Sequence, residues 1–142
     1  MMIRKQLRVA LLLTFIGALL ERATPAAAED TMSATAAPAA PLDARRFEVT
    51  VQPKGEESWG DTLTFDRGTF VSEACSGYGF GPSAYATKRM GEALTFRVEA
   101  RSESEGTSQW KGQVQKGSIE GTMVWTRPGQ APALYHFRGQ QR

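Results

Sequence analysis

The chain has a single cysteine, Cys75, among its 142 residues. An internal disulfide is therefore excluded, although many small exported domains use disulfides to compensate for a small core. An unpaired cysteine in an oxidising compartment can join two copies of a chain, so a disulfide-linked dimer through Cys75 is one open alternative. The other is a buried and inert side chain, because free cysteine packs like a small apolar residue.

Histidine is equally scarce, and His136 is the only one. Zinc sites use three or four histidine, cysteine or carboxylate ligands, so a metal site built on histidines is excluded. The sequence predicts no metal and no cofactor. Cys75 and His136 could act together as nucleophile and base, but no sequence feature brings them together. We therefore expect no catalytic residues and no enzymatic activity, with a thiol-dependent enzyme as the remote alternative.

Long hydrophobic runs are also missing. The main apolar run, residues 9–20, has 12 residues. At about 1.5 Å per residue it reaches about 18 Å, short of the ~30 Å hydrocarbon core of a membrane. Three basic residues precede it and three alanines, ending at Ala28, follow it. This order predicts a signal peptide over residues 1–28, a periplasmic or secreted location, and no stable membrane anchor after cleavage. An uncleaved anchor is the rival interpretation.

The chain has little excess charge of either sign. The full chain has 17 basic and 15 acidic residues. Cleavage after Ala28 removes four basic residues and one acidic residue, which leaves 13 basic and 14 acidic residues. No basic cluster occurs in the remainder, so the sequence predicts no nucleic-acid partner.

Large apolar side chains are almost absent from residues 29–44, which are rich in Ala, Pro, Thr and Ser. Such a segment buries too little surface to offset the ordering of its backbone, and we expect a disordered linker. Residues 45–142 then form one domain.

That domain alternates apolar and polar residues with period two. Phe47, Val49 and Val51 share one face, and Leu94, Phe96, Val98 and Ala100 share another. This alternation is typical of strands with one buried face. Glycine-containing turns separate the segments. The predicted strands are 46–52, 60–66, 69–76, 83–89, 93–102, 107–115, 118–126 and 132–140.

Consecutive strands with short links predict an all-β, antiparallel, eight-stranded up-and-down meander. Closure into a small barrel would remove the exposed sheet edges, and a two-sheet sandwich is the alternative. In the last strand, Tyr135, Phe137 and Gly139 are expected to face inward, and His136 is expected to face solvent.

The segment from Trp110 to Trp125, followed by Ala133 to Gly139, resembles the late strands of lipocalin-like, calycin-type barrels. The domain also resembles small exported bacterial proteins of unassigned activity. The lipocalin Gly-x-Trp signature is not evident, because Ser58-Trp59-Gly60 has the reverse order. The resemblance implies ligand binding by analogy of fold alone.

An interior ligand site would be lined by aromatic side chains. The expected ligand-binding residues are Tyr78, Phe80, Tyr85, Phe96, Trp110, Trp125 and Tyr135. Most of them could equally be core residues. Residues 77–82, rich in glycine and aromatics, are either a flexible hairpin connection or a mobile aromatic flap over a ligand mouth. If the rings instead plug the barrel end, the segment is a structural closure.

The sequence thus favours an exported, non-enzymatic domain that binds a small apolar or aromatic molecule in a β-barrel. The alternative is a protein-interaction module of the cell envelope that docks a partner through a strand edge or through residues 77–82. A dry, filled interior would favour the alternative.

Overall fold

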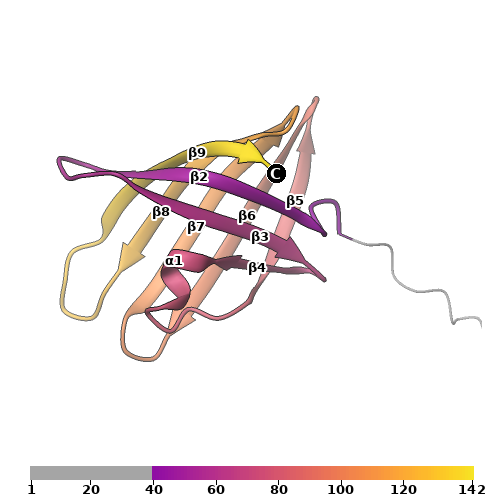
Figure 1. Ribbon diagram of the computed structural model, residues 1–142. Helices are drawn as coiled ribbons and strands as arrows, with labels where there is room; N and C mark the ends of the chain where they lie inside the picture. The colour runs from indigo at the N-terminus through magenta and orange to yellow at the C-terminus, as the bar shows by residue number, and fades with distance from the viewer. Residues whose placement is uncertain (1–39) are drawn as a thin grey trace, which may run out of the picture. The chain divides into compact units, whose positions relative to one another are not determined.

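The computed structural model describes residues 40–142. The predicted signal peptide, and the predicted linker up to residue 39, lie outside the described residues. Within residues 40–142, eight antiparallel strands in sequential order form a closed barrel, because the last strand pairs with the first (Figure 1). The predicted all-β meander is confirmed, and the barrel replaces the two-sheet alternative. Its strands are β2 (Arg45–Pro53), β3 (Trp59–Asp66), β4 (Thr69–Ser72), β5 (Ser83–Met90), β6 (Ala93–Ser102), β7 (Gly106–Gln115), β8 (Ser118–Thr126) and β9 (Ala133–Gln141).

The barrel has two ends with different coverings. The loops 54–58, 77–82, 103–105 and 127–132 gather at one end, which we call the aromatic end and which lies to the left in Figure 1. The opposite end carries the short turns and residues 40–44, and we call it the N-terminal end.

The period-two pattern correctly predicts which side chains face the interior. Phe47, Val49 and Val51 are buried on β2, and the alternate residues Glu48 and Thr50 are exposed. On β9, Phe137 is buried and His136 is exposed, as expected. Burial of one face of each strand supplies the main stabilising contribution, because apolar area is removed from water.

The predicted strand over residues 69–76 is wrong in its second half. β4 ends at Ser72, and residues Glu73–Ser76 form a single helical turn, α1. Ser72 caps this turn, because its Oγ accepts a hydrogen bond from the amide of Cys75 at 3.1 Å. The buried Asp61 binds the same turn, since its Oδ1 accepts from the amide of Ala74 at 2.9 Å and its Oδ2 accepts from Ser72 Oγ. A polar side chain on β3 thus satisfies helix-end amides that a strand pattern does not reveal.

The barrel unit begins before residue 45. Residues 41–44 form turns, and the side chain of Leu42 is 0% exposed within the core. The next residue, Asp43, accepts hydrogen bonds from the amide of Gly68 at 2.8 Å and from the hydroxyl of Tyr85 at 2.7 Å. The part of the predicted linker from residue 40 onward is therefore ordered and closes the N-terminal end.

Inward-facing glycines let aromatic rings lie close to the barrel wall. Phe96, Gly112, Gly121 and Phe137 are partners across β6 to β9. A Cβ at Gly121 would lie 2.1 Å from the carbonyl oxygen of Lys111 and 2.8 Å from the ring of Phe137. Only glycine fits at this position, and the two rings fill the volume that side chains would otherwise take.

Candidate functional site

The predicted interior site is occupied by the protein's own side chains. Phe96 and Trp110 are each 1% exposed. The Trp110 ring lies 5.0 Å from that of Phe70 and 5.3 Å from that of Phe137. The indole nitrogen of Trp110 donates to Ser108 Oγ at 3.2 Å, so its polar group is satisfied inside the core.

The space left inside is very small. The interior cavity next to Cys75, Phe80 and Trp110 has a volume of about 10 Å³. A single water molecule needs about 10–15 Å³ by the same measure. A ligand of aromatic size at this place would therefore have to displace core side chains.

Tyr85 takes part in the closure of the N-terminal end. Burial raises the pKa of Tyr85 well above its usual range, and the hydrogen bond to Asp43 raises it further. The amide of Gly68 and then the hydroxyl of Tyr85 lower the pKa of Asp43. These groups form a latch between the segment before β2 and the start of β5.

At the aromatic end, Trp125 lies at the centre of a cluster of side chains. The rings of Tyr78 and Phe80 contact it edge-on, with centroids at 5.2 and 5.7 Å. The guanidinium of Arg127 lies 3.7 Å from the centroid of the indole, and the indole nitrogen donates to the carbonyl of Glu105 at 2.8 Å. Phe80 is buried, whereas Tyr78 is 49% exposed. Residues 77–82 therefore combine a closing side chain with an exposed ring.

A second aromatic pair lies at the same end. Trp59, at the start of β3, is 36% exposed and contacts Tyr135 edge-on, with ring centroids 5.6 Å apart. Sequence reasoning missed Trp59, although a signal was present. Alternate residues of β3 face inward, and this inner face contains Phe65, Leu63, Asp61 and Trp59. Trp59 is the last of them and, unlike the other three, it is exposed.

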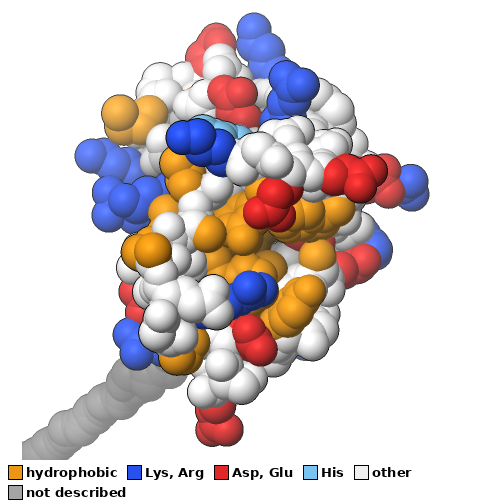
Figure 2. Space-filling view, turned by 90° about the vertical axis from the view of Figure 1, so that its left-hand side faces the viewer, with side chains coloured by type: hydrophobic (Ala, Val, Ile, Leu, Met, Phe, Trp, Pro, Cys, Tyr) orange, Lys and Arg blue, Asp and Glu red, His pale blue; other side chains and the backbone are white. Residues whose placement is uncertain are grey.

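Hydrophobic side chains gather on this face of the molecule, as Figure 2 shows, and charged side chains border them. The loops at the aromatic end and α1 carry five acidic residues against two basic ones. The acidic residues are Glu56, Glu57, Glu73, Glu103 and Glu105, and the basic ones are Lys54 and Arg127. Two of the carboxylates are ion-paired, Glu73 with Arg46 and Glu105 with Arg127, and Arg127 also lies over Trp125. The aromatic end therefore has exposed rings next to one arginine, and an excess of acidic residues in its loops.

Cys75 and His136 lie on opposite sides of the barrel wall. Cys75 is buried in the core on α1, where burial raises the pKa of its thiol. His136 is exposed on the outer face of β9. A protonated thiol separated by the wall from the imidazole does not form a nucleophile–base pair. A disulfide between two copies would likewise require α1 to move, because the thiol is covered.

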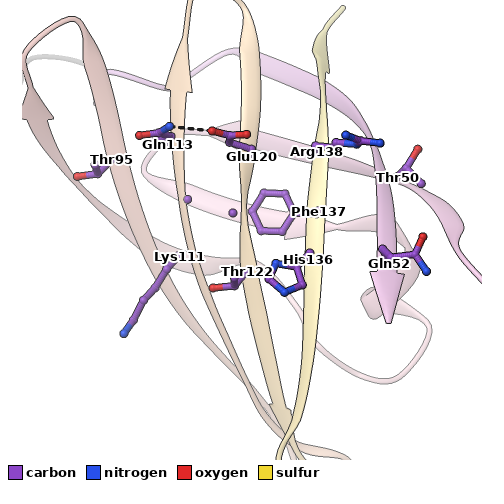
Figure 3. Close-up of a pocket in the computed structure, with 12 residues that line it drawn as sticks. Thr50, Gln52, Thr95, Lys111, Gln113, Glu120, Thr122, His136, Phe137 and Arg138 are labelled. Atoms are coloured by element: carbon purple, nitrogen blue, oxygen red, sulfur yellow. Dashed lines mark hydrogen bonds between the residues drawn. The ribbon is translucent and has the colours of Figure 1, made fainter. Parts of the chain in front are cut away.

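The outer wall around His136 carries an open hollow of about 740 Å³ (Figure 3). Two rows of outward side chains border it and cross four neighbouring strands. One row is Gln113, Glu120, Arg138 and Thr50, and the other is Lys111, Thr122, His136 and Gln52. Between the rows, the backbone of Gly112, Gly121 and Phe137 forms the floor. We call this hollow the wall groove.

The fold and these surfaces define a class: a small closed β-barrel with a filled interior and two surface features, an aromatic end and a wall groove. Comparison with protein-family models, curated protein sequences and solved structures gives no match. In residues 40–142, no helix is long and apolar enough to cross a membrane. The same residues hold no cluster of three or more His, Cys, Asp or Glu side chains with the geometry of a metal site.

Proposed function

We propose that this protein is an exported, non-enzymatic interaction module that docks a basic, apolar segment of a partner protein on its aromatic end. The observation that carries the proposal is the contrast between a filled interior and two exposed rings, Trp59 and Tyr78, at one end. The strand-edge mode of docking is less suitable, because β2 and β9 pair and close the sheet.

The residue types at this end suit a protein interface. Tryptophan, tyrosine and arginine dominate the binding energy of many interfaces, because they bury large areas and keep a polar group for hydrogen bonding. Trp59 is supported by Tyr135, and Tyr78 by Trp125. Rings that are already held by neighbours lose little conformational entropy when a partner binds.

Charge selects the kind of partner. The acidic excess around the aromatic centre attracts a segment that carries Lys or Arg next to apolar side chains. Such complementarity acts mainly on the association rate and on specificity, so the interaction should weaken as salt is added.

A small apolar molecule inside the barrel remains the second candidate, on the resemblance to lipocalin-like proteins. Binding of such a molecule would require rearrangement of the side chains around Phe70 and Trp110, whose ring centroids lie 5.0 Å apart. Export rests on the signal peptide predicted over residues 1–28 and is part of the proposal.

The proposal is tested by intrinsic tryptophan fluorescence with a synthetic peptide of alternating Lys and Leu around one Pro. The control peptide has Glu in place of each Lys. We expect saturable binding of the Lys peptide, weaker binding at high salt, and no binding of the Glu peptide.

Matched variants distinguish specific binding at the aromatic end from nonspecific binding to any exposed apolar side chain. Trp59→Ser with Tyr78→Ser should weaken binding of the Lys peptide at least about tenfold, because loss of one hot-spot ring costs about 2 kcal/mol and a tenfold change corresponds to about 1.4 kcal/mol. Met90→Ser, which removes an exposed apolar side chain at the other end of the barrel, should leave it unchanged. Equal binding of both peptides, or a double variant that binds like the parent, would refute the proposal. Self-association of the protein without peptide would identify a second copy as the occupant instead.

A further inference from the structure

Four basic side chains without ion-pair partners lie on one wall of the barrel. Within residues 40–142, six basic residues form ion pairs and seven do not. Four of the seven are Lys88, Arg97, Lys111 and Arg138, and the other three, Arg45, Lys54 and Arg89, lie elsewhere on the chain. All four are exposed, and they point outward from β5, β6, β7 and β9. Lys111 and Arg138 border the wall groove itself. Arg97 and Lys88 lie outside it, where the same two rows continue across β6 and β5.

Two basic side chains, Lys111 and Arg138, lie on opposite sides of the groove. Figure 3 shows Lys111 and Arg138 extending outward from opposite sides, with Thr122 and His136 between them. Glu120 is the only acidic residue that lines the groove, and it accepts a hydrogen bond from Gln113 at 2.9 Å. The charge along the rim is therefore positive, with neutral donors and acceptors in the middle.

We propose that the wall groove binds a small organic anion that also carries several hydroxyl groups, such as a sugar acid or a sugar phosphate. Its anionic group would lie against Arg138 or Lys111, because charge-assisted hydrogen bonds are the stronger ones. Its hydroxyl groups would pair with Glu120, Thr122 and His136. This site is separate from the aromatic end.

The shape of the groove agrees with a ligand of this size. Its volume of about 740 Å³ falls within the range of ligand pockets, about 300–1,000 Å³. The width of the groove does not depend on Gly112 and Gly121 being glycines. A Cβ at either position would point inward, toward the ring of Phe96 or Phe137, and away from the groove. Gly112, Gly121 and Phe137 form the floor, and the two rows of side chains would supply the ligand contacts.

His136 offers a direct readout, because it is the only histidine in the chain. Protein made without a histidine tag gives one imidazole signal in an NMR spectrum. We would titrate D-glucuronate at fixed pH and constant ionic strength and follow that signal. D-glucose 6-phosphate distinguishes a phosphate from a carboxylate as the preferred anion, and either response supports the site.

Two simple compounds serve as ligand controls. D-glucose lacks the charge and acetate lacks the hydroxyl groups, so each should bind at least tenfold more weakly than D-glucuronate. An acetate response equal to that of D-glucuronate would overturn the proposal, because it would show only general attraction of anions.

Single substitutions locate the site. Lys111→Gln and Arg138→Gln should each weaken binding about tenfold, the loss expected for one hydrogen bond to a charged group. Arg101→Gln makes the same charge change outside the groove, at a residue already paired with Glu99, and should leave binding unchanged. No saturable shift of His136 with either anion, or equal affinities for the three variants, would contradict the proposal.

Discussion

At the scale of single residues, glycine decides how closely the rings approach the wall. Gly112, Gly121 and Gly139 face inward, and a Cβ at each would meet another atom at 2.7 Å or less. The interior can therefore be filled by large aromatics, with little space left over. The filled core therefore depends on these inward glycines.

Replacement of one glycine tests this explanation. We expect Gly121→Ala to lower the free energy of unfolding by about 1–3 kcal/mol or more, the usual effect of overpacking a core. Gly60→Ala is the matched control, since a Cβ there meets nothing within 4 Å. It should change stability by less than about 0.5 kcal/mol. Equal losses in urea unfolding would contradict the account.

The latch between Asp43 and Tyr85 predicts how stability depends on pH. The lowered pKa of Asp43 means that its ionised form stabilises the fold, and this contribution is lost as the pH falls through the folded-state pKa. The raised pKa of Tyr85 means that its neutral form stabilises the fold. That contribution is complete below about pH 10, the ordinary tyrosine value, and is lost as the pH rises toward the folded-state pKa.

Tyr85→Phe isolates the alkaline part of this dependence. Urea unfolding at several pH values should show a smaller loss of stability above about pH 10 in the variant than in the parent chain. At neutral pH the variant should be less stable, because Asp43 loses one hydrogen bond. An unchanged alkaline slope would show that the hydroxyl of Tyr85 is not held as described.

At the scale of elements, the pattern of alternation predicts strands well and their interruptions poorly. The inward positions of β2, β6 and β9 follow from period two alone, because the pleat fixes the side of every residue. The helical turn α1 depends on Asp61, a residue on another strand, and the order of residues 40–44 depends on burial of Leu42. Such contacts join distant parts of the chain, so a local pattern contains no sign of them.

The segment between α1 and β5 contains two rings with different roles. Phe80 is buried against Trp125, and Tyr78 is half-exposed beside it. Phe80→Ala should therefore cost about 3–5 kcal/mol, the usual range for removal of a buried aromatic ring. Tyr78→Ala should cost much less and should act on binding of the Lys peptide.

Thermal unfolding of the two variants shows whether residues 77–82 close the barrel end or form a mobile flap. A large drop in melting temperature for Phe80→Ala alone agrees with a closed barrel end. Little loss of stability in both variants would instead support a mobile flap over residues 77–82.

At the scale of the whole molecule, the barrel is closed and aromatic side chains pack in its interior, so both of our proposals concern its outer surface. The aromatic end has an excess of acidic residues in its loops, and the wall around His136 has unpaired basic side chains. The sequence predicts the barrel but not whether it is filled, because the interior of an eight-stranded barrel can either be filled by side chains or hold one small ligand.

The three tryptophans report directly on the central claim, that recognition uses the aromatic end and not the interior. Trp59 and Trp125 lie at that end, and Trp110 lies in the core. Their indole N–H signals in a proton–nitrogen NMR spectrum can be assigned with single Trp→Phe variants. During titration with the Lys peptide, we predict that the signals of Trp59 and Trp125 shift while that of Trp110 stays in place. A shift of Trp110, with the other two unchanged, would contradict the account and indicate a ligand inside the barrel.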